Sequence, residues 1–329
     1  MNAVARGLIY ELRPKILERR ARLEAATRTV SAEYVTSLLA EIDATLQRIE
    51  DGTFGLCESC HDPIEADRLA RNPLLRFCLD HLTAEQMKAH EEDLELATQI
   101  QSNLLPEKHI TISDWETRYR YEPAGVVGGD YCEIIPCCEG RSLFFALGDV
   151  TGKGVAASLL MTHLSAIFRS LLSLDLPLED VIFRANRLFC DSTPATHYAT
   201  LVAARTTAEG LDLCSAGHCR PLLLRHGGGA EWIDSTGLPL GLFCSGRYTI
   251  RRLRLNRGDS LVLYTDGVTE AQDPEGNLYG EPGLLRSLQG YTEPDATAMV
   301  DRVLEDVTRF RGAAPQQDDI TLLMVRRRT

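Results

Sequence analysis

Residues 141–172 read RSLFFALGDVTGKGVAASLLMTHLSAIFRSLL and contain the pattern on which the fold of this chain depends. An apolar run of β type leads to Asp149, a glycine-containing turn follows, and the remainder has the apolar spacing of a helix. Asp149 is therefore predicted to lie at the end of a strand, directly before a helix. A carboxylate on a rigid strand end needs little reorganisation to bind a ligand.

Further aspartates occur where other strands are expected to stop or turns to begin. Asp130 follows two glycines, Asp266 lies in a Thr-Asp-Gly turn, and Asp318 and Asp319 precede the last apolar run. A single aspartate beside glycine is a common turn pairing. Several carboxylates at strand ends can converge on Mg²⁺ or Mn²⁺, and two such ions can bind phosphoryl oxygens and activate water. The pattern predicts a two-metal hydrolytic site without a nucleophilic side chain.

The region beyond Pro106 consists mainly of short β-type runs. Helical spacing is confined to residues 155–172, 178–191 and 296–310. Because strands come in runs and do not alternate regularly with helices, the predicted fold class is α+β, a helix-flanked β-sandwich. The expected strands lie in RSLFFALGDV, HYATLVAART, LDLCSA, RPLLLRHG, YTIRRLRL, SLVLYTDG and ITLLMVRR.

Four metal-binding side chains occur as two close pairs in a short segment rich in glycine and proline. Cys57 and Cys60 form a C-x₂-C pair, and Cys78 and His81 form a C-x₂-H pair seventeen residues later. This spacing suits one tetrahedral structural Zn²⁺ ion. His61 could compete as a ligand, although it breaks the paired spacing. A redox interpretation of the C-x-x-C pair lacks the βαβ context that it requires.

Helical patterns flank this segment on both sides. Residues 5–50 predict a helical hairpin whose second helix starts near Ser31, and the charged stretch 82–105 predicts a linker helix that Pro106 ends. The predicted organisation is a helical hairpin at 1–50, a zinc finger at 51–82, a linker helix at 83–105 and a catalytic domain at 106–329.

Composition limits the classes of partner. The chain has 329 residues, a formal net charge of −12, 44% hydrophobic and 25% charged residues, a balance typical of globular proteins. The negative charge disfavours direct nucleic-acid binding. No uninterrupted apolar run reaches the roughly 18 residues of a membrane span, and the first residues do not resemble a signal peptide. We expect a cytoplasmic protein without membrane association, whose cysteines are reduced apart from the metal ligands.

Two motifs suggest other phosphate chemistry. Cys214 and Arg220 have the C-x₅-R spacing of cysteine-dependent phosphatases. Such a loop should enter a helix that lowers the pKa of the thiol, whereas Pro221 and the residues after it predict the second strand of a hairpin. Cys214 is therefore predicted to be structural. Lys153 lies one residue short of a phosphate-binding loop, and Gly154 replaces the hydroxyl that would hold Mg²⁺, so that interpretation is rejected.

Seven blocks occur in the order LATQIQSNLLP, AGVVGGDY, GDVTGKGVAASLLM, CSAGHCRPLLL, STGLPLGLF, LVLYTDGVTEAQD and QQDDITLLMV. Together they span residues 95–327 and resemble the PPM-type phosphatases of the SpoIIE and RsbU branch. The resemblance implies hydrolysis of phosphoserine or phosphothreonine on proteins with two Mn²⁺ or Mg²⁺ ions. It also implies, as substrate, a phosphorylated anti-sigma-factor antagonist or another small phosphoprotein of bacterial partner switching.

The resemblance also implies roles for individual residues. Asp149 would bridge both metal ions, and Asp266 and Asp318 would bind the second one. Asp130 would be a metal ligand or hold a water molecule. Asp319 is the weaker candidate, because asparagine can replace it in relatives. With one backbone carbonyl included, the implied set of metal contacts is Asp130, Asp149, Val150, Asp266, Asp318 and Asp319.

The segment LQRIEDGTFGLCESCHDPIEADRLARNPLLRFCLDH, within residues 40–82, resembles the zinc finger of the DksA/TraR family. Members with four cysteines are common there, whereas His81 takes the last position here. That family acts on RNA polymerase through the tip of its helical hairpin, but residues 28–33 lack the paired aspartates that DksA uses. We expect a regulatory or dimerisation role. The alternative is a transcription-associated protein that contacts RNA polymerase and carries a degenerate phosphatase domain.

The linker helix carries a short apolar seam. Met87 and Leu94 are seven residues apart, as are Ala97 and Leu104, and most of the remaining residues are charged. One interpretation is that this helix packs on its own catalytic domain. The other, which the resemblance favours, is that paired linker helices form a homodimer and regulate the loop near Asp130. On that interpretation Leu94→Glu should shift a dimer toward monomer.

Overall fold

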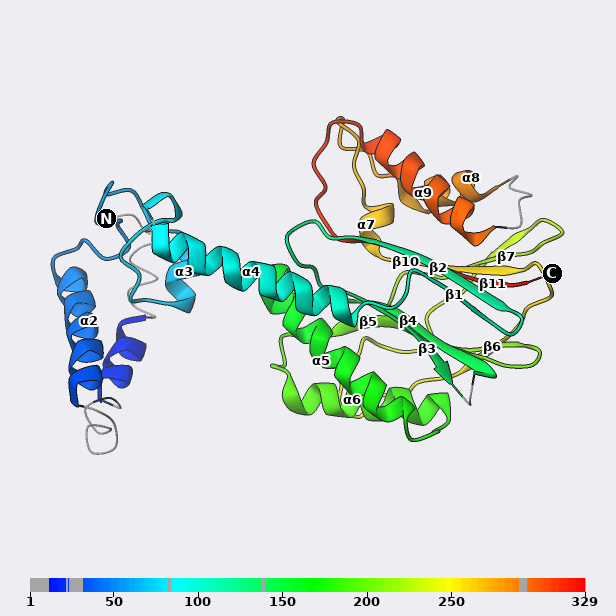
Figure 1. The fold of residues 1–329 in the computed structure, drawn as a ribbon, viewed down its shortest axis with the longest axis horizontal. Helices are drawn as coiled ribbons and strands as arrows, with labels where there is room; N and C mark the ends of the chain where they lie inside the picture. Colours follow the sequence, from blue (N-terminus) through cyan, green and yellow to red (C-terminus); the bar gives the residue numbers. More distant parts are fainter. Residues whose placement is uncertain are drawn as a thin grey trace. The chain divides into compact units, whose positions relative to one another are not determined.

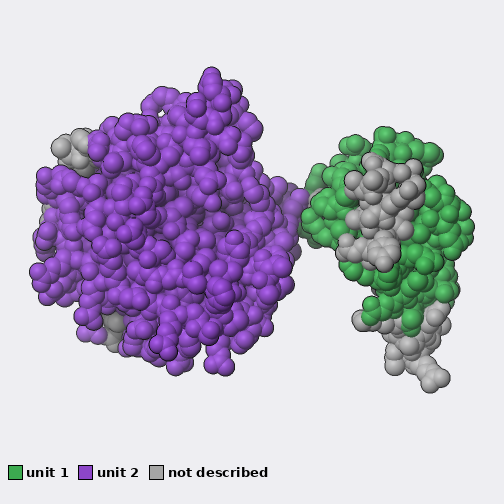
Figure 2. All heavy atoms as spheres, turned by 180° about the vertical axis from the view of Figure 1, so that it is seen from behind, with its two compact units in different colours: residues 1–93 green, residues 94–329 purple. Residues whose placement is uncertain are grey.

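The computed structural model of this chain forms two compact units, unit 1 at residues 1–93 and unit 2 at residues 94–329 (Figure 2). The boundary falls inside the predicted linker helix. The structure describes residues 12–21, 23, 32–81, 84–137, 140–289 and 295–328. Ser31 and residues 28–31 of the predicted hairpin tip lie outside the described residues.

Unit 1 has a small core built partly from the cysteines of the predicted zinc site. Residues 12–21 are helical, and α2 (Ala32–Glu50) supplies the other long helix of this core. The elements that follow are α3 (Ala66–Arg71), the 3₁₀ turn η1 (Leu79–His81) and α4 (Ala84–Leu104). The buried members of the core are Leu12, Ile16, Ile42, Phe54, Cys57, Ile64, Leu69 and Cys78.

Unit 2 contains two antiparallel sheets. The six-stranded sheet has the order β1-β2-β11-β10-β7-β8, and the five-stranded sheet has the order β3-β4-β5-β6-β9. The strands of the first sheet are β1 (His109–Ile112), β2 (Trp115–Glu122), β7 (Leu222–Leu224), β8 (Ala230–Trp232), β10 (Ser260–Tyr264) and β11 (Ile320–Arg327). Those of the second are β3 (Asp130–Cys137), β4 (Ser142–Val150), β5 (Ala199–Thr206), β6 (Gly210–Ala216) and β9 (Arg251–Arg254).

Helices cover the outer face of each sheet, as Figure 1 shows for the two layers of unit 2. The five-stranded sheet is covered by α5 (Gly154–Leu172) and α6 (Leu178–Ser192). The six-stranded sheet is covered by α8 (Gly280–Leu288) and α9 (Ala296–Arg311). This arrangement confirms the predicted α+β class and the helix-flanked β-sandwich. The expected helix at 296–310 corresponds to α9.

Strand β4 shows why the opening stretch decides the fold. Phe144 and Ala146 are buried in the cluster that contains α5 and α6, whereas Phe145 and Leu147 are buried in the cluster between the two sheets. Successive side chains of a strand point to opposite faces. A strand covered on both faces therefore has a continuous apolar run instead of an alternating pattern.

Helix α5 is the one helix, among the residues described, that is long and apolar enough to cross a membrane by length and composition alone. Its buried residues are part of the protein core. Phe168 stacks near the rings of Tyr131 and Phe144, with centroids 5.7 and 5.8 Å away. The apolar surface of α5 is thus largely accounted for by packing on the five-stranded sheet.

Strands β2 and β3 were not among the expected strands, because each carries charged residues. On β2, Trp115 and Tyr119 are buried between the sheets, while Arg120 pairs with Asp301 of α9 at 3.0 Å. On β3, Glu133 is buried and accepts hydrogen bonds from Arg169 and Ser165 of α5. The local sequence does not show these tertiary partners.

One expectation about the cysteines is wrong. The structure joins Cys190 of α6 to Cys244 in the loop before β9 by a disulfide, so not all thiols outside the zinc site are free. Asn186 of α6 brings this loop close, because it accepts a hydrogen bond from Gly241 N–H and donates one to the Phe243 carbonyl, both at 2.9 Å. Fifty-four residues separate the two cysteines, and nothing in their spacing indicates the contact.

Candidate active site and zinc centre

Three aspartates lie together at one end of the sandwich. Asp149 is the penultimate residue of β4, Asp266 follows β10 and opens the short helix α7 (Asp266–Thr269), and Asp318 lies just before β11. Strands β10 and β11 are neighbours in one sheet, and β4 belongs to the other. The site therefore depends on the two sheets being packed together.

Burial and mutual repulsion act on these carboxyl groups. Burial, followed by the nearby carboxylates of Asp266 and Asp318, raises the pKa of Asp149 to about 7. The pKa of Asp266 is also raised, first by burial and then by Asp318. Bringing such groups together as anions is unfavourable unless cations compensate them. Their oxygen atoms are the donors that Mg²⁺ and Mn²⁺ prefer, so the cluster fits the predicted ions.

Asp130 is the most deeply buried of the predicted site aspartates, at 2% exposure. It lies directly across from Asp149 in the β3–β4 pairing. The hydroxyls of Thr265 and Thr321 both donate hydrogen bonds to its Oδ2. Burial raises the pKa of this carboxyl well above its ordinary value. Asp130 therefore connects β3 to the strand ends that carry Asp266 and Asp318.

Asp319 holds the loop that leads to Asp130. Its two carboxylate oxygens accept hydrogen bonds from the backbone N–H groups of Ala124, at 2.8 Å, and Gly129, at 2.7 Å. A Cβ at Gly128 would lie 2.2 Å from Asp319 Oδ2 and 2.3 Å from the hydroxyl oxygen of Tyr121. Only glycine therefore fits at this position. Asp319 thus has a structural task that the sequence did not indicate, and its role as a metal ligand stays a prediction.

Gln101 of α4 is a further residue that the sequence analysis missed. Its side chain is buried, donates a hydrogen bond to the Gly128 carbonyl at 2.8 Å and accepts one from the Gly128 N–H at 3.2 Å. The last turns of α4 are thereby tied to the loop that precedes Asp130. A signal was present, since glutamine is a poor choice for the buried side of a helix unless both its polar atoms are satisfied.

Lys153 contacts the aspartate cluster directly. Its ammonium group lies 2.9 Å from Asp318 Oδ2 and 2.7 Å from the Gln317 carbonyl. The rejected phosphate-loop interpretation had drawn attention to this lysine, but the structure places it against a carboxylate. Gly152 and Gly154 on either side have positive φ angles of 109° and 67°, which allow the tight turn from β4 into α5.

His218 was also missed as a candidate. It is buried, and its Nδ1 lies 2.8 Å from the hydroxyl of Thr200 on β5. Thr200 is the cross-strand neighbour of Asp149. Burial lowers the pKa of His218 to about 4, so the ring is neutral near pH 7. It can therefore position the strand that carries Asp149 without adding charge to the site.

The cysteine motif does not form a nucleophile loop. Cys214 is buried on β6, where burial raises the pKa of its thiol to about 11, and Arg220 forms an ion pair with Glu281. No helix follows, since Pro221 leads into β7. The expected hairpin is wrong, however, because β6 and β7 belong to different sheets. Gly217, with a φ of 69°, lies in the connection between the two sheets.

Two hollows flank Asp318 and Lys153. One has a volume of about 200 Å³ and is lined also by Glu270, Gln272 and Arg311. The other has a volume of about 440 Å³ and lies among the start of α5, the loop 124–127 and Leu94 of α4. The aspartate cluster therefore opens onto surface from which a substrate side chain can approach.

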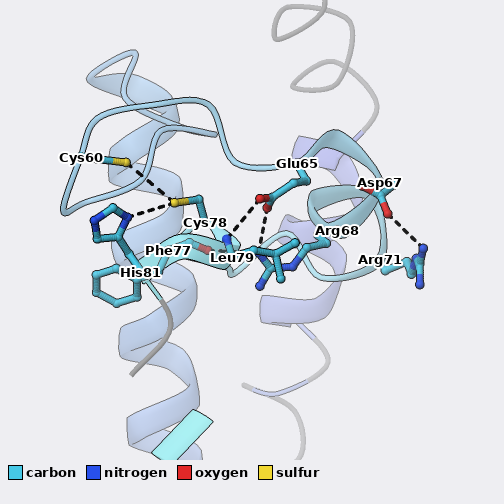
Figure 3. Close-up of polar contacts among 9 residues, drawn as sticks. All are labelled: Cys60, Glu65, Asp67, Arg68, Arg71, Phe77, Cys78, Leu79 and His81. Atoms are coloured by element: carbon cyan, nitrogen blue, oxygen red, sulfur yellow. Dashed lines mark hydrogen bonds and ion pairs between the residues drawn. The ribbon is translucent and has the colours of Figure 1, made fainter. Parts of the chain in front are cut away.

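In unit 1, the four predicted zinc ligands meet. The donor atoms of Cys57, Cys60, Cys78 and His81 all lie within 4.8 Å of one another, and no other group of such residues in the described ranges is equally compact. Figure 3 shows that Cys60 and His81 both contact Cys78, whose sulfur lies 3.8 Å from Cys60 Sγ and 3.2 Å from His81 Nδ1. This donor set fits a tetrahedral Zn²⁺ ion. His61 is exposed and does not join the group.

Polar contacts hold the elements around this centre. Glu65, just before α3, accepts a hydrogen bond from the backbone N–H of Leu79, which opens the turn carrying His81 (Figure 3). Arg48 of α2 donates hydrogen bonds to the carbonyls of Leu56 and Leu75, one on each side of the finger. The helices and the finger therefore form one structural unit.

The fold and the strand-end carboxylates define unit 2 as a PPM-type (PP2C) serine/threonine phosphatase domain. The family described as Stage II sporulation protein E (SpoIIE) matches residues 139–328, and the chain belongs to this family. The prokaryotic dksA/traR C4-type zinc finger matches residues 52–80. His81, the fourth donor, lies one residue beyond that match.

Among curated relatives, Protein IcfG of Synechocystis sp. is 27% identical over 281 residues, covering 75% of this chain and 43% of IcfG. Phosphoserine phosphatase RsbU of Bacillus subtilis is 25% identical over 241 residues, covering 72% of this chain and 71% of RsbU. This chain thus spans less than half the length of IcfG.

Solved structures show the same fold. The SiaA-PP2C domain of Pseudomonas aeruginosa has a TM-score of 0.63 at 18% identity, covering 74% of this chain and 98% of that domain. The PP2C phosphatase domain of SpoIIE from Bacillus subtilis, solved with a fragment of its regulatory domain, has a TM-score of 0.56 at 20% identity. It covers 67% of this chain and 64% of that structure.

The first prediction concerns zinc. Purified full-length protein should contain about one tightly bound Zn²⁺ per chain by elemental analysis. Cys78→Ser should lose the ion and make unit 1 sensitive to protease, because folding and metal binding are coupled in such small units. His81→Cys should keep the ion, and Cys219→Ser in unit 2 is the control. Protein purified without chelators and devoid of zinc would contradict this assignment.

The second prediction concerns Cys214. The Cys214→Ser variant should turn over an aryl phosphate within about threefold of the wild-type rate, because a buried thiol with a raised pKa is a poor nucleophile. Chelation by EDTA should stop the reaction, and excess Mn²⁺ should restore it. Activity that survives chelation but disappears in the serine variant would assign the reaction to the cysteine instead.

Proposed function

We propose that unit 2 hydrolyses phosphoserine or phosphothreonine on a protein substrate, with two Mn²⁺ or Mg²⁺ ions held by the aspartate cluster. The observation that carries this proposal is the position of Asp149, Asp266 and Asp318. They come from the ends of strands in two different sheets, and their negative charges oppose one another. Repulsion among these carboxylates is unfavourable when no cation is bound. A cation-binding function explains why they are held together.

The metal-binding roles of the residues are those that the resemblance to PPM-type phosphatases implies. Asp149 would hold both ions, and Asp266 and Asp318 would hold the second, while the Val150 carbonyl would contribute a backbone oxygen. Divalent ions, when bound, supply a Lewis acid that binds phosphoryl oxygens and lowers the pKa of water. RsbX, a structure with a TM-score of 0.50 and 15% identity, was solved in complex with magnesium.

Other residues position the cluster or the substrate. Asp130 and Asp319 would join the metal-binding set while keeping the hydrogen bonds that fix β3 and the loop before it. Lys153 lies against Asp318 in the structure. Its ammonium group is exposed, so it can turn toward an incoming phosphate and leave Asp318 to a cation.

The protein substrate is proposed from the relatives. RsbU and RsbP of Bacillus subtilis are both named phosphoserine phosphatases, and each aligns with more than 70% of this chain. A phosphorylated anti-sigma-factor antagonist in bacterial partner switching is the substrate class that this similarity favours. The hollow of about 200 Å³ beside Asp318 has room for a phosphorylated side chain presented by a larger partner. We propose that the reaction takes place in the cytoplasm.

The alternative of an RNA-polymerase-binding protein with a degenerate phosphatase domain gains no support from the described residues. All the expected aspartates are present at strand ends. Residues 28–31 of the hairpin tip lie outside the described residues, so contact with RNA polymerase stays a prediction.

The structure adds contacts that bear on the linker seam. Leu94 lines the hollow beside loop 124–127, Thr98 donates a hydrogen bond to the Leu94 carbonyl, and Gln101 is buried against Gly128. The Gln101 contact ties the C-terminal part of α4 to its own domain, which favours the first interpretation of the seam, and the homodimer stays a prediction. Leu96 and Ile100 are the exposed apolar residues of this part of α4, at 55% and 48% exposure. We propose that these two residues contribute to a homodimer.

The third prediction tests the catalytic cluster. Asp149→Asn should lower Mn²⁺-dependent turnover of a phosphoserine protein substrate by several orders of magnitude, because the variant removes a charge that holds the ions. Without added metal, its melting temperature should equal or exceed that of wild type, because one repelling carboxylate is gone. The exposed Asp191→Asn on α6 is the matched control. A variant that kept more than about a tenth of the wild-type rate would refute the two-metal assignment.

The fourth prediction separates assembly from regulation. Leu96→Glu should shift the full chain from dimer to monomer in light scattering, because it places a charge on an exposed apolar surface. Leu94→Glu should leave assembly unchanged and alter turnover, because Leu94 faces the loop before Asp130. If Leu94→Glu, and not Leu96→Glu, converted the dimer to monomer, the prediction would be wrong. Leu94 would then belong to the dimer interface.

A further inference from the structure

Arg326, near the end of β11, is a largely buried cation for which the described residues supply no counterion. It is 4% exposed, and among the described residues its guanidinium makes no hydrogen bond or ion pair. An arginine side chain stays protonated at any physiological pH. No nitrogen of Arg326 is among the fully buried side-chain nitrogens that lack a partner, so the unpaired guanidinium reaches solvent-accessible space. A largely buried charge without a partner is unfavourable, so the environment of Arg326 requires an explanation.

The strand pattern places Arg326 under the helical layer. Leu323 and Val325 are buried between the sheets, whereas Leu322 and Met324 are buried against α8 and α9. Because side chains alternate along a strand, Arg326 belongs to the side that faces the helices.

Glu116, the acidic residue paired with Arg326 across the strands, does not neutralise the Arg326 charge. Arg326 lies opposite Glu116 on β2, but the Glu116 carboxylate contacts His109 at 3.2 Å. On the other side its neighbour is Ser260 of β10, which is uncharged.

Arg326 lines a cavity of about 430 Å³ within unit 2. This volume is within the range of small-molecule sites. Leu224, Leu288 and Met299 supply apolar surface, and Ser260 and Gln289 supply polar groups. No aspartate or glutamate is among the described residues that line it. The second arginine of the cavity, Arg225, is already paired with Asp259 at 2.8 Å.

One part of the rim of this cavity consists of glycines. Gly228 and Gly229 have φ angles of 91° and 104°, and an added Cβ at either would have no atom within 4 Å. These glycines form the tip of the β7–β8 turn, which closes through a hydrogen bond from Gly228 N–H to the Arg225 carbonyl at 2.9 Å. Access to Arg326 from solvent is therefore not obstructed by side chains at this tip.

We propose that this cavity binds a small organic anion, whose phosphate or carboxylate group pairs with Arg326 and whose apolar part contacts Leu224, Leu288 and Met299. A guanidinium presents parallel N–H groups that suit either anion in bidentate geometry. The site is separate from the catalytic cluster, because Asp319 and Arg326 are seven residues apart on an extended chain, a distance of about 20 Å.

The test is titration calorimetry on the full chain, without added divalent ions, using phenylphosphonate and phenylacetate as probes. At least one probe should bind at one site per chain, and Arg326→Met should weaken that binding by about tenfold or more. Arg252→Met is the matched control, since that side chain is 90% exposed on β9. Binding of phenylphosphonate alone identifies a phosphate-type ligand, and binding of phenylacetate alone identifies a carboxylate.

A second measurement separates a ligand site from a structural arginine. Without probe, Arg326→Met should melt at the same temperature as wild type or higher, because methionine fills similar space without an uncompensated charge. Failure of both probes to bind wild type, equal affinity in wild type and Arg326→Met, or a markedly lower melting temperature of the variant would each overturn the proposal. Binding at the catalytic cluster would not respond to Arg326→Met.

Discussion

Repulsion among the carboxylates of Asp149, Asp266 and Asp318 is the constraint around which unit 2 is arranged. Each carboxylate is attached at or beside the end of a buried strand, and the strands come from two sheets that pack through an apolar core. The core fixes the backbone, so the charges cannot move apart. The protein thereby keeps together carboxylates whose repulsion is unfavourable without cations, which is the arrangement expected of the proposed metal site.

A layer of polar contacts supports this site without belonging to the cluster itself. Asp130 is held by two threonine hydroxyls, and Asp319 is held by two backbone N–H groups of the loop before it. Gln101 binds both backbone polar atoms of Gly128 in the same loop. A shift of α4 along its axis would have to break these bonds, so this helix is mechanically connected to the strand that carries Asp130.

Unit 1 reaches stability by a different route. Its hydrophobic core has few members, and two of them, Cys57 and Cys78, are also metal donors. A small domain of this kind needs an additional cross-link, which a structural zinc ion supplies. The finger and the helices then share one core, and loss of the ion would affect both. In unit 2, where the core is large, the proposed catalytic ions would serve chemistry instead of folding.

The sequence by itself determined the fold class, the zinc spacing and the strand-end position of Asp149, because these depend on local periodicity and on short-range spacing. Only the tertiary structure decided which distant groups meet. The buried role of Gln101, the disulfide between Cys190 and Cys244 and the burial of Arg326 all arise from contacts between segments far apart in the chain. The physical reason is that a side chain's partners are set by how sheets and helices pack, and no local pattern records them.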